Sequence, residues 1–98
     1  MSVSNMSFTK ESAVAAAKLD LASRLDVSES EIKELSVKDT DFPDMSLGAP
    51  AGDELAAQMI SSGWKIDLGV DGHSHEYRAD KYQLRLHNFD GRNYVIKK

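Results

Sequence analysis

Apolar side chains recur at helical spacing near the start of the chain. Between residues 10 and 25, Val14, Leu21 and Leu25 fall on one stripe at about 100° per residue, and small alanines flank them. Thr9 belongs to the residue types that helix N-caps prefer, and strong helix formers follow it. The pattern predicts a helix over about residues 10–25 that packs on the rest of the protein by one face.

Alternating apolar and polar residues replace the helical spacing in the middle of the chain. In "ELSVKDTDF", Leu35 and Val37 alternate with polar neighbours, which predicts a strand with one buried face. The stretch "WKIDLGVDGHSHEYRA" is typical of a hairpin, because Asp71-Gly72 suits a two-residue turn with positive φ at both positions. That turn forms one apolar face from the pairs Val70–His73, Leu68–His75, Ile66–Tyr77 and Trp64–Ala79.

The stretch "KYQLRLHN" repeats the alternation and predicts a further strand. Its inward residues would be Tyr82, Leu84 and Leu86. Its outward residues would be Lys81, Gln83, Arg85 and His87. Asp90-Gly91 marks a second hairpin turn before a short last strand in "NYVIKK". The predicted fold class is α+β, with the N-terminal helix packed on a mostly antiparallel sheet of four or five strands in two layers.

One domain accounts for the whole pattern. The 98 residues are close to the commonest domain size, and the chain shows neither an internal repeat nor a linker. We expect a single α+β domain over residues 9–98, preceded by a disordered segment over residues 1–8. Residues 53–60, "DELAAQMI", read on their own as a two-turn helix, although so short a helix needs tertiary contacts.

Charge is distributed unevenly along the chain. The net charge of −4 is the sum of −8 over residues 1–77 and +4 over residues 78–98. The overall acidity opposes general affinity for nucleic acid, which depends on neutralising many phosphates, so nucleic acid is not an expected partner. For the basic end we favour a solvated strand face over a local phosphate contact.

The absence of cysteine excludes several kinds of chemistry. Disulfides, thiolate catalysis, Fe–S clusters and cysteine-ligated zinc are all ruled out. No apolar run reaches the length of a membrane span, and the first ten residues lack the basic and apolar parts of a secretory signal. We therefore expect a cytoplasmic protein that contacts no membrane, unless an export segment was removed from the chain.

Two groups of residues raise the possibility of a metal site. His73 and His75 lie two apart on a predicted strand and so point to the same side, but no third ligand is near them in the sequence. Asp39, Asp41 and Asp44 are spaced like the start of a calcium loop, yet the glycine and glutamate that an EF-hand needs are missing. We favour a packing role for His75 and an exposed acidic turn for the carboxylates.

No catalytic arrangement is recognisable in the sequence. The serines lie neither in a nucleophile elbow nor beside a histidine with an orienting acid. The stretch "SLGAPAG" lacks the lysine and the G-x-G spacing of a phosphate-binding loop. We therefore expect neither enzyme activity nor a cofactor.

Several stretches resemble an uncharacterised domain of bacteria and cyanobacteria. They are "DLASRLDVSESEI", "SLGAPAG", "GWKIDL" and "HEYRAD", and together they cover about residues 15–87. The family motif D-x-S-L-G-C-P-x-x-G matches Asp44, Ser46, Leu47, Gly48 and Pro50, and Gly52 lies one position before the place of its last glycine. Ala49 stands in place of the motif cysteine, which suits a reducing compartment, and His75 and Arg78 replace a tyrosine and a histidine. The resemblance implies a fold and a stable loop, and no activity.

The sequence favours a small soluble binding or interaction module without catalytic activity. We expect it to use the loop at 40–53, because an irregular loop on a rigid scaffold is a common place for binding. The candidate binding residues are Phe42, Asp44, Met45, Ser46, Leu47, Gly48, Pro50 and Gly52. The alternative is a protein that binds a divalent metal through the histidine pair or the three aspartates. The expected partner is a protein or small ligand, and we expect a monomer.

Overall fold

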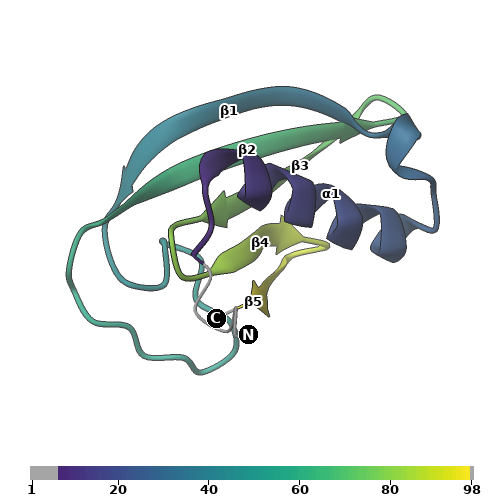
Figure 1. The fold of residues 1–98 in the computed structure, drawn as a ribbon. Coiled ribbons are helices and arrows are strands. Elements are labelled where there is room, and N and C mark those ends of the chain that lie inside the picture. The colour runs from purple at the N-terminus through teal and green to yellow at the C-terminus, as the bar shows by residue number, and fades with distance from the viewer. Residues whose placement is uncertain (1–6, 98) are drawn as a thin grey trace, which may run out of the picture.

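The computed structural model describes residues 7–97, which form one helix and a five-stranded sheet (Figure 1). The elements are α1 (Lys10–Leu25), a single 3₁₀ turn η1 (Glu29–Glu31), β1 (Lys33–Phe42), β2 (Ser61–Val70), β3 (His73–Ala79), β4 (Leu84–Phe89) and β5 (Arg92–Lys97). The predicted α+β class is confirmed. No helix among residues 7–97 is long and apolar enough to cross a bilayer.

Helix α1 begins and ends where the sequence predicts. The Thr9 side chain accepts a hydrogen bond from the Ser12 amide, and Ser12 in turn accepts one from the Thr9 amide, which satisfies two amides at the helix start. Asp26 closes the helix in the left-handed conformation, with φ of 56°. Of the segment 1–8 that we expected to be disordered, residues 1–6 lie outside the described range, whereas Phe8 packs against the core.

The sheet is an antiparallel meander in the order β1-β2-β3-β4-β5. The β2–β3 register has all four predicted pairs, from Trp64–Ala79 to Val70–His73. At both hairpin turns the aspartate and the glycine have positive φ, as a type I′ turn requires: 51° and 79° at Asp71-Gly72, and 52° and 83° at Asp90-Gly91. The two turns therefore set the pairing of four of the five strands.

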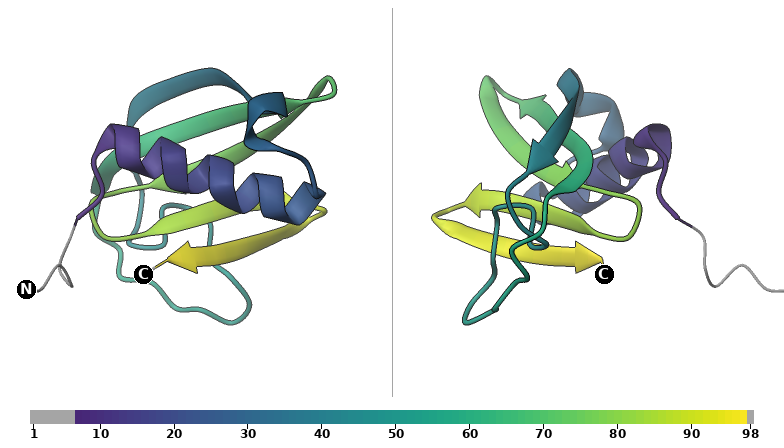
Figure 2. Two further views of the ribbon diagram at one scale, coloured as in Figure 1. Left: turned by 45° about the vertical axis from the view of Figure 1, so that its right-hand side comes forward. Right: turned by 90° about the vertical axis from the view of Figure 1, so that its left-hand side faces the viewer.

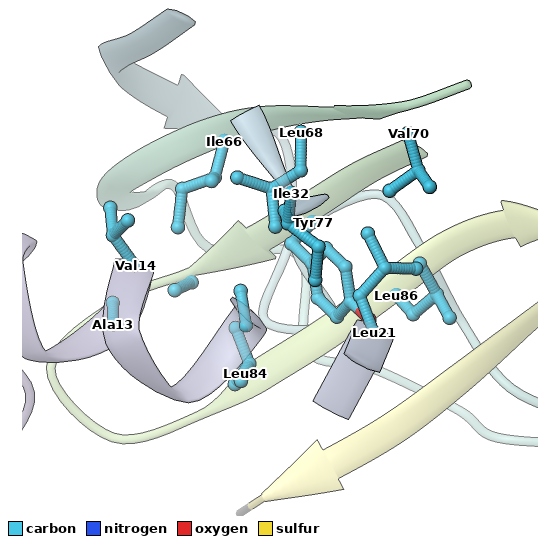
Figure 3. Close-up of a cluster of buried hydrophobic side chains, with 12 residues drawn as sticks. Ala13, Val14, Leu21, Ile32, Ile66, Leu68, Val70, Tyr77, Leu84 and Leu86 are labelled. Atoms are coloured by element: carbon cyan, nitrogen blue, oxygen red, sulfur yellow. The ribbon is translucent and has the colours of Figure 1, made fainter. Parts of the chain in front are cut away.

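The core lies between α1 and one face of the sheet (Figures 2 and 3). Tyr77 is its largest fully buried side chain, and the Tyr77 hydroxyl donates a hydrogen bond of 2.7 Å to the carboxylate of Asp20 on α1. Burial, reinforced by the bond to Asp20, raises the pKa of Tyr77 far above its ordinary value. Arg24 pairs with the same carboxylate at 2.6 Å, so the buried hydroxyl of the tyrosine and the half-buried carboxylate of Asp20 both have partners.

Two predicted inward residues are exposed because the chain departs from regular strand geometry. A β-bulge between Glu34 and Ser36 shifts the register of β1, so Leu35 is 55% exposed instead of facing the core. Tyr82 is exposed because β4 does not begin until Leu84. Asp80 holds the residues between β3 and β4 in a turn, since its Oδ1 accepts hydrogen bonds from the amides of Tyr82 and Gln83.

Candidate functional site

The loop between β1 and β2, residues 43–60, lies on the sheet face opposite α1. Tyr77 and Leu86 face the helix, so the alternation of a strand directs Arg78 and Arg85 to the other face. Both arginines donate to carbonyls of the loop. In the left view of Figure 2, one part of the loop accordingly passes behind β4 and β5, and the rest extends beyond them. The first half of the loop thus covers part of the outer face of the sheet in the two-layer fold.

Asp44 fixes the first turn of the loop through one carboxylate oxygen. Its Oδ1 accepts hydrogen bonds from the amide and hydroxyl of Ser46, at 2.9 and 2.6 Å, and from the amide of Gly48 at 3.1 Å. Leu47 and Gly48 take positive φ values of 59° and 67°, which is the backbone path that this turn follows. The hydrogen bonds, led by the Ser46 hydroxyl, lower the pKa of Asp44 below its ordinary value.

Arg85 is the centre of the contact between loop and sheet. The side chain is only 3% exposed, although the sequence predicts it on a solvated face. Its guanidinium holds both carboxylate oxygens of Glu54, with Nη2 at 2.8 Å from Oε2. Nη1 also donates to the Ala49 carbonyl at 3.1 Å, and Nε donates to the Gln83 side chain at 2.7 Å. A bidentate pair of this kind fixes position and orientation together.

Three more side chains, two from the sheet and one from the turn before β4, donate to carbonyls of the loop. These bonds join Arg78 to Leu47 at 2.9 Å, Gln83 to Met45 at 2.7 Å and Asn93 to Pro50 at 2.9 Å. Among the described residues, no loop amide donates to the carbonyls of Met45, Leu47 or Pro50, so side chains supply these bonds. The donors are outward residues of β3 and β5 and one residue of the turn before β4. The prediction of a solvated face is therefore wrong for Gln83 and Arg85, which the loop covers. The positively charged C-terminal part of the chain is the surface on which the acidic loop packs.

The structure divides the candidate binding residues into buried and exposed ones. Leu47 is fully buried, and Ser46 and Phe42 are buried as well. Phe42 lies under the guanidinium of Arg78, 5.7 Å from the ring centroid. Asp44 and Gly48 are half-buried, and the exposed members are Met45, Pro50 and Gly52. Most of the motif residues thus shape the loop and are covered, so they cannot all touch a partner.

Three large apolar side chains of residues 55–60 are exposed, which the sequence does not predict. Leu55, Met59 and Ile60 are 97%, 62% and 73% exposed. The helix that "DELAAQMI" suggests does not form, because Glu54 is drawn into a turn with Ala51 and onto Arg85. Eight residues without a tertiary partner for their apolar side do not hold a helix.

The three aspartates that suggested calcium point to different partners. Asp39 pairs with Lys10 at 3.1 Å, Asp41 accepts from the Ser62 hydroxyl at 2.7 Å, and Asp44 is occupied within its own turn. Within residues 7–97 no group of three or more potential ligand side chains is close enough to hold a metal ion.

The two histidines of β3 have unequal surroundings. His73 is exposed at the hairpin end, whereas His75 is half-buried with its ring centroid 5.7 Å from that of Phe89. Burial, followed by the nearby His73, lowers the pKa of His75. Its contact with Phe89 fits the packing role that we favoured. Metal binding by the pair stays a prediction.

Replacing Asp44 with alanine is expected to loosen the first turn and to reduce stability by about 1 kcal/mol, as for the loss of a helix cap. Because the folded pKa of Asp44 is lowered, its contribution is complete above the unfolded value of 3.8 and is lost as the pH falls through the folded value. Amide spectra of residues 44–49 recorded between about pH 5 and pH 2 test this. Asp44→Asn keeps a neutral acceptor, so this control should keep the turn yet lose the acid-dependent change; an unchanged acid response in Asp44→Ala would contradict the assignment.

The comparisons with known proteins agree with the sequence resemblance. A family model described as "Domain of unknown function (DUF8738)" matches residues 14–87, a range that contains α1 from its second turn, β1 to β3, most of β4 and the whole loop. No curated protein and no solved structure matches the chain. Since the model covers well over half of the residues, the chain belongs to the family described as Domain of unknown function (DUF8738).

Proposed function

We propose that this protein is a small non-catalytic binding module that presents the β1–β2 loop to a partner. Residues 43–54 are the fixed part of the loop, and residues 55–60 are the contact segment. In line with the resemblance and the cysteine-free composition, we also propose a bacterial source and a cytoplasmic location.

The observation that carries the proposal is the exposure of Leu55, Met59 and Ile60 at the end of a loop that is otherwise tied to the sheet. Among the described residues, the one backbone hydrogen bond that reaches 55–60 from outside runs from the Met45 amide to the Ala57 carbonyl, at 2.9 Å. Neighbouring exposed apolar side chains on a soluble domain mark an interaction site more often than isolated ones do. Because residues 43–54 are already fixed to the sheet, the contact segment loses less conformational entropy when it binds a partner.

An affinity experiment with Leu55→Asp tests the proposal. Immobilised wild-type protein is expected to retain a partner from a cell extract, and Leu55→Asp is expected to lose that partner by at least about tenfold. Leu19→Asp is the matched control, because Leu19 is an exposed leucine on α1, away from the loop. If wild type, Leu55→Asp and Leu19→Asp retain the same proteins in the same amounts, the contact segment has no such role.

A further inference from the structure

The contact segment lies in a stretch of the chain without any basic residue. Between Lys38 and Lys65 every charged side chain is acidic: Asp39, Asp41, Asp44, Asp53 and Glu54. Glu54 is neutralised by Arg85 and Asp39 by Lys10, but Asp53 is exposed directly before the segment. An occupant that covers Leu55, Met59 and Ile60 should therefore offer an apolar surface with basic side chains at its rim. Contact between two such segments would bring like charges together and is disfavoured.

A surface with those properties exists on the protein itself. A hollow of about 340 Å³ lies between the start of α1, β4 and the end of β5, and its apolar lining is Phe8, Ala16, Leu84 and Ile96. Lys97 lines the same hollow, and exposed Lys81 adjoins it, because its carbonyl accepts from the Phe8 amide at 2.8 Å. The hollow is thus both apolar and basic.

We propose that a second copy of this chain covers the contact segment, with Leu55, Met59 and Ile60 of one copy seated in the hollow of the other. This inference rests on the proposed function of the loop and names its partner. It also replaces the expectation of a monomer, which took no account of the exposure of residues 55–60.

The arrangement of the two surfaces favours a closed pair over an open chain. The loop and the end of β5, which borders the hollow, lie toward the same end of the molecule (Figures 1 and 2). A two-fold axis at that end lets each copy insert its segment and receive the other, so the association stops at two copies. The two contacts would form together, and each would join an acidic segment to a basic rim.

Sedimentation velocity on the full chain tests the pairing. Between about 5 and about 500 μM, a range that brackets micromolar dissociation constants, the wild type is expected to pass from monomer to dimer. Leu55→Asp should weaken the dimer by at least about tenfold, whereas Leu19→Asp should leave it unchanged. A wild type that stays monomeric throughout overturns the inference, and so does a dimer that Leu55→Asp leaves unchanged.

Single cysteines identify which surfaces meet, because the chain has none of its own. Gln58→Cys lies in the segment and Ser7→Cys lies at the hollow. In a mixture of the two variants, the disulfide between them should form faster than the disulfide between two molecules of the same variant. It should also form faster than the disulfide between Ser7→Cys and the control variant Ser23→Cys, whose exposed cysteine lies on α1. Equal rates overturn the proposed pairing. One result would separate the two proposals: the wild type is monomeric, yet it captures a partner that Leu55→Asp does not capture. That result would overturn the pairing of two copies and leave the proposed function standing.

Discussion

Replacing Arg85 with methionine is expected to release the loop from the sheet and to lower stability by about 3 kcal/mol. Methionine keeps the apolar stem, but the Glu54 carboxylate loses its bidentate partner and the Ala49 carbonyl loses its donor. The side chains of Arg85 and Glu54 are only 4% and 24% exposed, so water cannot fully replace the lost bonds. For a domain of this size the expected fall in melting temperature is about 15 °C.

Two further variants separate the ion pair from a general effect of charge. Arg92→Met removes an exposed arginine from β5 and should change stability by no more than about 0.5 kcal/mol. Adding Glu54→Leu to Arg85→Met removes the carboxylate that has lost its charged partner, so part of the lost stability should return. Thermal unfolding by circular dichroism measures all three proteins. If Arg85→Met melts at the temperature of Arg92→Met, the loop is held by other contacts.

Replacing Gly63 with alanine is expected to be the most damaging single-methyl change in the sheet. A Cβ atom at this position would lie 2.0 Å from the Ala79 carbonyl oxygen and 2.9 Å from the Asp80 Cα. Both are backbone atoms, so β2 and the end of β3 would have to separate. We expect a loss of about 3 kcal/mol or more, which for a marginally stable domain leaves a visible unfolded fraction at room temperature.

Gly69→Ala on the same strand is the matched control. There the three atoms nearest to the new methyl all belong to the Leu35 side chain, the closest at 3.1 Å, and that exposed side chain can turn away. We expect a loss below about 1 kcal/mol, measured by urea unfolding of both variants. Similar losses for Gly63→Ala and Gly69→Ala would show that the backbone approach at Gly63 is not a constraint.

The sequence predicts the scaffold well because local chemistry decides it. Helix α1 follows from its cap and its apolar stripe, and the hairpins follow from the two Asp-Gly turns. The motif loop follows in part, since the positive φ of Gly48 and Gly52 and the burial of Leu47 suit residues that fix a backbone path. Each of these features is determined by residues close together in the chain.

The missed features depend on contacts between distant parts of the chain. Nothing near Arg85 in sequence indicates that a loop more than thirty residues earlier will cover it. The distribution of charge could still have indicated the contact between loop and sheet. The loop has acidic but no basic residues, whereas the end of the chain is basic and carries hydrogen-bond donors at alternate positions. The bulge at Leu35 and the loss of the helix at 53–60 are likewise outcomes of packing that periodicity alone does not reveal.

The length of the β1–β2 loop has a consequence for how the chain folds. Strands β2 to β5 are joined by short connections, two of them Asp-Gly turns, whereas β1 reaches its neighbour β2 across residues 43–60. The entropic part of the free energy of closing this longer connection is about 2 kcal/mol larger than that of closing a two-residue turn. We therefore expect β2 to β5 to assemble early, with β1 and the loop joining last. The part of the molecule that presents the contact segment would then also be the part that opens most readily in the native state.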